Sequence, residues 1–325
     1  MIPDKLKPGD EIRVISPATS LGVIPDEQRE DAERLLNSLG FKVTYSRYAF
    51  DVDAFRSATV EKRVQDLHDA FRDPNVKAML TTLGGYNSNQ MLEFLDYDLI
   101  RTNPKILCGY SDITALGNAV YAKTGLVTYS GPHFSTFAMH KGLEKTIEGF
   151  QQCLMDEEII DVKPSETWSD DAWYLDQDNR HFIENDGWQV ITEGEGEGTL
   201  LGGNQCTLNL LQGTPYMPSL VDSILFLEDD ELVDAPQFDR DLQSLVHQPE
   251  FDRVRGVVIG RFQTKSKIAS EDIRYIVRSK KALCRVPVIA NVDFGHTYPL
   301  LTFPIGGYVK INASEREVSI KITNH

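Results

Sequence analysis

The feature that most constrains this sequence is a regular alternation of apolar runs and amphipathic stretches over its first 125 residues. Short apolar runs that end in Gly, Ser or Pro are typical of buried strands, whereas apolar residues spaced three and four apart indicate helices. The pattern predicts strands at 11–18, 41–46, 76–85 and 105–111, and helices at 26–40, 60–74, 88–98 and 113–125. Strands that alternate with helices form parallel α/β sheets, so we expect an N-terminal, Rossmann-like α/β domain.

The texture of the sequence changes after about residue 155. A polar, Trp-rich stretch is followed by short apolar runs separated by glycines, as in GEGTLLGG and DSILFLEDD. A chain of 325 residues also exceeds what one ordinary hydrophobic core holds. We therefore expect an α/β domain at 1–160, a Trp-rich substrate loop at 161–190 and a second, β-rich domain at 191–325. A single compact barrel is the alternative.

Composition excludes several classes of partner and cofactor. The formal net charge of −16 would repel nucleic acids and anionic membranes. The sequence has no long apolar run, and its first residues do not form a basic segment followed by an apolar one. We therefore expect a cytoplasmic protein with no membrane partner. Its four scattered cysteines show no CxxC pair and no Cys/His spacing for zinc, which predicts reduced thiols and no metal. Neither GxxxxGKS nor an early GxGxxG motif occurs, so we expect no nucleotide cofactor.

Three predicted strands have polar or glycine-rich carboxyl ends: Ser16–Pro17, Gly84–Tyr86 and Gly109–Ser111. Ligands of parallel α/β sheets bind beyond the carboxyl ends of the strands, so these segments are expected to share one edge. Ser111 stands between a strand and a helix, where hydrolases expose a nucleophilic serine. The motif has Ile113 in place of the second glycine of G-x-S-x-G, and capping of the helix by Ser111 or Asp112 is the alternative.

A serine nucleophile needs a base that is itself oriented by a carboxylate. His296 follows an apolar run and a glycine, at a strand end where its ring can face a cleft, and His133 is the competing base. Glu228 directly follows an apolar strand, where a buried carboxylate would require a partner. We therefore predict a triad of Ser111, Glu228 and His296. Because the second domain supplies two of its members, the site is expected at the junction of the domains.

Acyl transfer at a serine also requires N–H donors that stabilise the oxyanion. The segment TTLGGYNSNQ offers Gly84 and Gly85, where the absence of Cβ atoms lets the main chain approach a ligand closely. We predict the backbone amides of Gly85 and Asp112 as the two donors. A Gly-Gly turn that serves only the backbone shape is the alternative for one of the glycines.

Five motifs occur in order along the chain: LGGYNSN, CGYSD, GGNQCTLNLL, LFLEDDE and NVDFGHTYP. Together they resemble the serine LD-carboxypeptidase family over nearly the whole chain, and most of all its microcin C immunity peptidases of the MccF type. The resemblance implies Ser111 as nucleophile, His296 as general base and Glu228 as the residue that orients it. It also implies a homodimer and a small-molecule substrate, either an aminoacyl-nucleotide or a peptide.

The same resemblance implies residues that bind the substrate. A loop tryptophan stacks on the purine in the immunity peptidases, which suggests Trp173, with Trp168 as second choice. Packing of both rings onto the body of the protein is the alternative. Asn204 in GGNQC matches a position that binds the amino-acid end of the substrate, and Tyr86 in the glycine motif is a further expected contact.

These observations predict a serine peptidase that hydrolyses the amide between an amino acid and a modified nucleotide, giving microcin C-type self-immunity or detoxification. An LD-carboxypeptidase that releases D-alanine from murein tetrapeptide is the first alternative, because the two subfamilies share the triad. A protein that binds an aminoacyl nucleotide without hydrolysing it is the second. An amidotransferase with Cys108 as nucleophile is a third, although Cys108 lies inside an apolar run and is expected to be buried.

Overall fold

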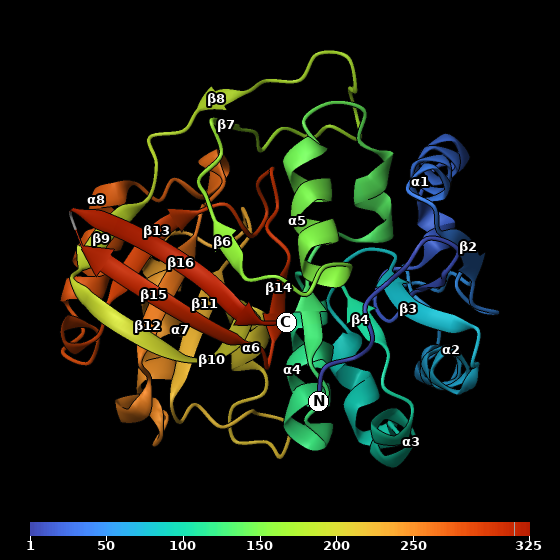
Figure 1. Ribbon diagram of the computed structural model, residues 1–325, viewed down its shortest axis with the longest axis horizontal. Coiled ribbons are helices and arrows are strands. Elements are labelled where there is room, and N and C mark those ends of the chain that lie inside the picture. Colours follow the sequence, from blue (N-terminus) through green and yellow to red (C-terminus); the bar gives the residue numbers. More distant parts are fainter. Residues whose placement is uncertain (315) are drawn as a thin grey trace.

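The computed structural model describes residues 1–314 and 316–325 and contains two large β-sheets (Figure 1). The first sheet has six strands in the order β14, β5, β4, β3, β1 and β2. Their bounds are β1 Glu11–Ile15, β2 Lys42–Tyr45, β3 Val76–Thr81, β4 Ile106–Cys108, β5 Thr128–Ser130 and β14 Phe303–Ile305. Strands β1 to β5 run parallel, as the alternation predicts, whereas β14 pairs antiparallel with β5.

Helices connect the strands of the first sheet. They are α1 Asp26–Ser38, α2 Val60–Arg72, α3 Tyr97–Thr102, α4 Ile113–Thr124 and α5 Glu144–Leu154, with 3-10 helices η1 Leu21–Val23, η2 Ser88–Phe94 and η3 Phe134–Ala138. The prediction of one helix at 88–98 is wrong, because η2 and α3 occupy this segment separately. Asp96 divides them, since its carboxylate accepts a hydrogen bond from the amide of Leu99 at 2.9 Å and starts a new helix.

The second sheet has eight strands in the order β6, β16, β15, β10, β11, β12, β13 and β9. Their bounds are β6 Ile160–Val162, β9 Gln189–Thr192, β10 Gly194–Asn204, β11 Ser223–Glu228, β12 Gly256–Gly260, β13 Val288–Val292, β15 Tyr308–Ser314 and β16 Glu317–Asn324. The central strands β10 to β13 are parallel and the outer ones antiparallel, so the predicted β-rich C-terminal part is confirmed.

The remaining elements surround this second sheet. They are α6 Gln205–Asn209, α7 Ala235–Val246, α8 Ser270–Arg278, η4 Phe251–Arg253, η5 Thr264–Ser266, η6 Leu283–Arg285 and the small pair β7 Thr167–Trp168 and β8 Ile183–Glu184. Figure 1 shows β7 and β8 in a long connection that passes over one end of the molecule. In the described part of the chain, no helix is long and apolar enough to span a membrane.

The two halves of the chain exchange strands. β14 comes late in the sequence but completes the first sheet, and β6, at the boundary expected between the α/β domain and the Trp-rich loop, pairs with β16 in the second sheet. The boundaries expected near residues 160 and 190 therefore stay predictions. The exchange holds the two sheets in a fixed relation, which is what a site between them requires.

Three buried phenylalanines join the sheets beneath the junction. Phe226 lies on β11 and Phe294 just after β13, whereas Phe303 lies on β14 of the first sheet. The ring of Phe303 is 5.1 Å from that of Phe226 and 5.4 Å from that of Phe294, measured between centroids. Aromatic pairs at such distances contribute beyond their buried area. These three rings are called here the aromatic cluster. Two of them stand two residues before a candidate triad member: Phe226 before Glu228, and Phe294 before His296.

Truncation of the aromatic cluster should weaken the whole fold. Phe303→Ala is expected to lower the free energy of unfolding by about 3–5 kcal/mol, because a fully buried ring is replaced by a cavity between the sheets. Urea denaturation measures the change. Phe94→Ala is the control, since Phe94 is 56% exposed and its loss should change stability little. Equal midpoints for the two variants would contradict a stabilising role for the cluster.

Candidate active site

Ser111 lies between β4 and α4 at a backbone φ of +60°. This left-handed conformation is uncommon for a residue other than glycine and stores strain that the surrounding structure must hold. A serine on such a strand-to-helix turn projects its hydroxyl above the sheet. Gly84 lies against the turn, because a Cβ atom there would come within 2.9 Å of both Cβ and Oγ of Ser111. Only a glycine therefore lets the loop after β3 approach this hydroxyl.

Side chains of the second sheet reach the Ser111 hydroxyl. Nε2 of His296 is 3.0 Å from Oγ of Ser111, and Nδ1 of His296 is 2.8 Å from Oε2 of Glu228. When Nδ1–H donates to the carboxylate, Nε2 is left as an acceptor for the serine hydroxyl. The structure thus brings together the three residues that the sequence analysis selected, in the order serine, imidazole, carboxylate.

The electrostatics of this chain follow from burial and from neighbouring carboxylates. Glu228 is 3% exposed, so its charge depends on the hydrogen bond from His296. Burial lowers the pKa of His296, but the charge and hydrogen bond of Glu228, with Asp230 and Asp229, outweigh it and raise that pKa above its usual value. The imidazole therefore accepts a proton more readily than a free histidine does.

Two glycines make room for the Glu228 side chain. A Cβ atom at Gly295 would come within 2.7 Å of Oε2 of Glu228, and one at Gly260 within 2.9 Å of its Cβ. Gly295 also has a φ of +108°, which other residues rarely adopt. The backbone around the carboxylate is close enough to exclude other side chains, so Glu228 is fixed in position behind His296.

Asp112 ties the glycine loop to the serine turn. Its Oδ2 accepts hydrogen bonds from the amides of Asn87 at 3.1 Å and Ser88 at 2.9 Å, and the Ser88 hydroxyl donates to its carbonyl at 2.7 Å. Burial raises the pKa of Asp112, and these donors partly oppose the rise. The Asp112 carboxylate thus bonds to amides at the start of η2. It makes no capping hydrogen bond to α4, which was the alternative role considered for Asp112.

The two amides expected to form an oxyanion hole border the same loop. Gly85 has a φ of +157°, and a Cβ atom there would lie 2.9 Å from Oγ1 of Thr19. Within residues 1–314 and 316–325, neither the Gly85 nor the Asp112 amide donates to a protein acceptor. Both N–H groups therefore remain available to a ligand, while their contribution to catalysis stays a prediction.

Arg63 supports these loops and was not selected from the sequence. It is 3% exposed and donates to the carbonyl of Pro17 at 2.8 Å and to that of Asn87 at 2.9 Å, joining the loops after β1 and β3. The signal was present, since Arg63 falls on the apolar face of its helix together with Val64 and Leu67. A charged residue on such a face needs partners that only the folded chain supplies.

His133, the competing base, does not bond to Ser111. Its Nδ1 is 2.7 Å from Oγ1 of Thr81, and its ring stacks on Tyr110 at 4.3 Å between centroids. Burial, and the positive charge that His296 can carry, lower the pKa of His133 to about 3. This histidine is therefore neutral at ordinary pH. Tyr110 contacts both imidazoles, since its ring centroid also lies 5.2 Å from that of His296.

Asn204 is the cross-strand neighbour of Glu228, because β10 and β11 pair in that register. Its Oδ1 accepts from the amide of Thr207 at 3.1 Å and from the Thr207 hydroxyl at 2.8 Å, and its Nδ2 donates to Asp229 at 3.1 Å. The side chain is buried and held from both ends. It lies beside the candidate triad, as expected of a residue that would contact substrate.

The tryptophan loop lies across both halves of the chain. Asp170 accepts a hydrogen bond from the amide of Thr264 at 2.6 Å, and the carbonyl of Tyr174 accepts one from Gln28 on α1 at 2.9 Å. Trp173, between these anchors, is buried in the structure. The ring of Trp168 is partly exposed and carries the guanidinium of Arg261 over its face, 5.0 Å from the centroid.

Two further residues from the sequence analysis differ sharply in exposure. Tyr86 is 82% exposed and lies beside Gly85, so its ring is free to meet a ligand. Cys108 is fully buried, and burial raises the pKa of its thiol well above the ordinary value. A thiolate nucleophile is therefore disfavoured at this position, which speaks against the amidotransferase alternative.

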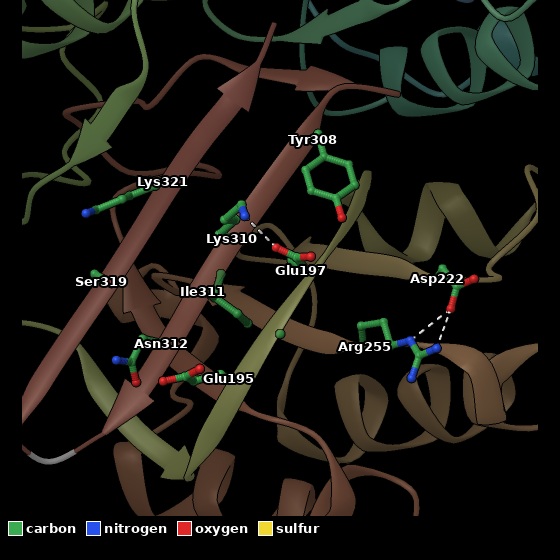
Figure 2. Close-up of a pocket in the computed structure, with 11 residues that line it drawn as sticks. Glu195, Glu197, Asp222, Arg255, Tyr308, Lys310, Ile311, Asn312, Ser319 and Lys321 are labelled. Atoms are coloured by element: carbon green, nitrogen blue, oxygen red, sulfur yellow. Dashed lines mark hydrogen bonds and ion pairs between the residues drawn. The ribbon is translucent and has the colours of Figure 1, made fainter.

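Two cavities lie at different distances from the candidate site: one over the face of the second sheet and one beside the glycine loop. A cavity of about 760 Å³ lies over β10, β15 and β16 and is bordered by charged side chains such as Glu197, Lys310 and Lys321 (Figure 2). None of the three triad candidates lines it. A cavity of about 480 Å³ is bordered by Gly85 and Tyr86 and therefore adjoins the glycine loop of the candidate site.

Comparison with protein families agrees with this geometry. Residues 12–131 match the LD-carboxypeptidase N-terminal domain, and residues 197–311 match the LD-carboxypeptidase C-terminal domain. The chain belongs to the LD-carboxypeptidase family, peptidase family S66. The resemblance inferred from the five sequence motifs is thereby confirmed, and membership of this family supports a hydrolase.

Similar family members carry different names. The carboxypeptidase YocD of Bacillus subtilis is 54% identical over 100% of both chains. The microcin C7 self-immunity protein MccF of Escherichia coli is 32% identical, over 96% of this chain and 93% of MccF. A Bacillus subtilis protein named for murein peptide carboxypeptidase activity is 29% identical, over 98% of this chain and 94% of its own.

Solved structures share the whole fold. A MccF-like protein from Bacillus anthracis has a TM-score of 0.99 and 58% identity, with 100% of both chains covered. MccF in complex with aspartyl sulfamoyl adenosine has a TM-score of 0.90 and 31% identity, with 100% of this chain and 99% of that one covered. The predicted fold class, a parallel-sheet N-terminal part with a β-rich C-terminal part, is confirmed.

Gly84→Ala should disable Ser111 without unfolding the protein, because the added Cβ meets the serine side chain at 2.9 Å. We expect labelling of Ser111 by a fluorophosphonate, followed by intact-protein mass spectrometry, to slow at least about tenfold, as misplacement of a reacting group typically does. Gly149→Ala is the matched control, since its added Cβ would meet only ordinary contacts, the nearest at 3.7 Å. Equal labelling rates in both variants would show that Gly84 has no such role.

Proposed function

We propose that this protein is a serine peptidase that hydrolyses the amide or acyl-sulfamate bond between an amino acid and a modified nucleotide. The observation that carries the proposal is the hydrogen-bonded chain from Ser111 through His296 to Glu228, with distances of 3.0 and 2.8 Å and the serine on a left-handed turn. The substrate class is supported by the similarity to MccF, whose structure was solved with aspartyl sulfamoyl adenosine.

In the proposed reaction, Nε2 of His296 takes the proton of Ser111 as Oγ attacks the substrate carbonyl. Glu228 stabilises the imidazolium that forms, and the amides of Gly85 and Asp112 donate to the oxyanion. The imidazolium then gives its proton to the leaving sulfamate or phosphoramidate nitrogen as the carbonyl–nitrogen bond breaks. Water, deprotonated by His296, cleaves the acyl-enzyme and restores the serine.

Substrate binding in this proposal uses both halves of the chain. Asn204 lies beside Glu228 and would hold the amino-acid end, whereas Tyr86 is exposed at the glycine loop and would contact the other side. A purine ring would stack on Trp173 or Trp168. Because Trp173 is buried here, stacking on it would require the loop to rearrange, whereas Trp168 is already partly exposed.

The proposed biological setting is the cytoplasm, where a homodimer of this chain would detoxify microcin C-type aminoacyl nucleotides. The similarity to the self-immunity protein MccF supports this setting. The second candidate function is release of D-alanine from murein tetrapeptide by an LD-carboxypeptidase. It is favoured by the relative named for murein peptide carboxypeptidase activity and by the family to which both halves of the chain belong.

Ser111→Ala should abolish hydrolysis, since it removes the hydroxyl that lies 3.0 Å from Nε2 of His296. We expect kcat/KM for aspartyl sulfamoyl adenosine to fall at least about a thousandfold, as when a triad serine is removed. Mass spectrometry of released aspartate and sulfamoyladenosine measures the reaction, and release of D-alanine from a murein tetrapeptide, at equal enzyme, compares the two functions.

Two outcomes of this experiment would contradict the proposal. Substantial turnover by Ser111→Ala would show that the serine is not the nucleophile. Binding without any turnover by the unmodified protein would favour the non-catalytic alternative. Cys108→Ala is the control for the amidotransferase alternative and should retain activity, because the thiol is buried away from His296.

A further inference from the structure

Asp229 is a buried carboxylic acid directly beside the candidate triad, with no part in the reaction proposed above. It follows Glu228 at the end of β11 and is 0% exposed. One carboxyl oxygen, Oδ1, accepts the hydrogen bond from Nδ2 of Asn204 at 3.1 Å. The other, Oδ2, is buried without a hydrogen-bond partner among residues 1–314 and 316–325. An ionised group in this position would leave one charged oxygen unpaired, which is costly.

The neighbours of Asp229 oppose its ionisation. Burial, followed by the negative charges of Glu228 and Asp230, raises its pKa to about 8, although the Cys206 amide and His296 act in the opposite direction. Asp229 therefore carries a proton at neutral pH and loses it only in mildly alkaline solution. A structural carboxylate that served merely as a hydrogen-bond acceptor would not need this environment.

We propose that Asp229 is a positioning residue of this site, which holds the Asn204 side chain and adds a second titratable carboxyl group behind His296. The inference rests on the proposed function for its effect on turnover. It concerns two interactions of Asp229. The first is the hydrogen bond with Asn204 on β10, and the second is the electrostatic interaction with the imidazole of His296.

The first interaction fixes which atoms Asn204 can offer a substrate. Both lone-pair directions of its Oδ1 are occupied by the amide and hydroxyl of Thr207, and one of its two Nδ2 hydrogens points to Asp229. Only the second Nδ2 hydrogen remains. Asn204 therefore meets the substrate as a donor, and the group it binds must be an acceptor such as a carbonyl or carboxylate oxygen.

The second interaction couples two titrations. The groups that act on His296 are Glu228, Asp229 and Asp230, at the end of β11 and just after it, whereas the charge of His296 in turn lowers the pKa of His133 from the first sheet. Ionisation of Asp229 adds negative charge near the imidazolium and so favours its protonated form. Two sites that interact in this way lose their protons in steps that belong to the pair. His296 then loses its proton over a wider pH range than it would beside Glu228 alone.

Asp229→Asn tests the inference because it keeps a planar side chain of the same size. Its oxygen still accepts a hydrogen bond from Asn204, but the group cannot ionise. Because Asp229 ionises only near pH 8, we expect the kcat/KM profile of the unmodified protein for aspartyl sulfamoyl adenosine to bend near that pH, and the profile of Asp229→Asn to lack this bend. Asp241→Asn is the matched control, since Asp241 faces Cys206 and is not among the groups that act on His296. A uniform loss of activity with a profile of unchanged shape would overturn the inference, because a purely structural role predicts that result.

A direct titration removes the dependence on turnover. The His296 imidazole can be followed by NMR in protein labelled with 15N-histidine, its signal identified by its loss in His296→Gln. The signal of the unmodified protein should show a second step near pH 8 that Asp229→Asn lacks, and identical titration curves would overturn the inference even if Ser111→Ala proves the proposed function right. Loss of that step in Asp229→Asn would support the inference even if the protein hydrolyses neither substrate and the proposed function fails.

Asp229→Ala and the pH dependence of unfolding separate positioning from folding. Loss of the acceptor for Asn204 should raise KM at least about fivefold, with a smaller change in kcat. Because the folded protein binds a proton at Asp229 that the unfolded chain releases near pH 4, the unmodified protein should lose stability as pH rises from about 4 to 8. Asp229→Asn should flatten this fall, and an identical fall in both proteins would contradict a protonated Asp229.

Discussion

The hydrogen bond between His296 and Ser111 is the contact on which the site depends, and it joins residues 185 positions apart in different sheets. Its length is set by how the sheets meet rather than by either residue. Phe226 and Phe294 each precede a member of the triad candidate by two residues, and both rings pack against Phe303, which β14 carries into the first sheet. A hydrophobic contact below the site thus determines a polar distance within it.

Burial of charge at this junction explains the glycines and the acids around it. Glu228 is held by one imidazole, and the backbone of Gly260 and Gly295 packs closely against its side chain. The next residue, Asp229, avoids a second uncompensated charge by keeping its proton. Two adjacent acids are tolerated here because Asp229 is protonated, so that only the charge of Glu228 has to be compensated by a partner.

Much of the fold could be predicted because strand and helix periodicities are local properties of the sequence. Ser111, Glu228 and His296 can be selected as polar residues just after apolar runs, and their proximity is predicted from the need of a serine nucleophile for a base that a carboxylate orients. Long-range contacts were not accessible in this way. The place of β14 in the first sheet depends on packing of Phe303, and the role of Arg63 depends on carbonyls of loops that are distant in sequence.

The two partners of the hydrogen bond between His296 and Ser111 are each held by contacts close to them. A left-handed serine costs about 1–3 kcal/mol, and the hydrogen bonds from Asn87 and Ser88 to Asp112 hold the turn from within the first sheet's own loops. The imidazole and its carboxylate are held just as locally by β11 and the segment after β13. Because β14 of the C-terminal half completes the first sheet, pairing of the two halves then brings the exposed hydroxyl to the oriented ring.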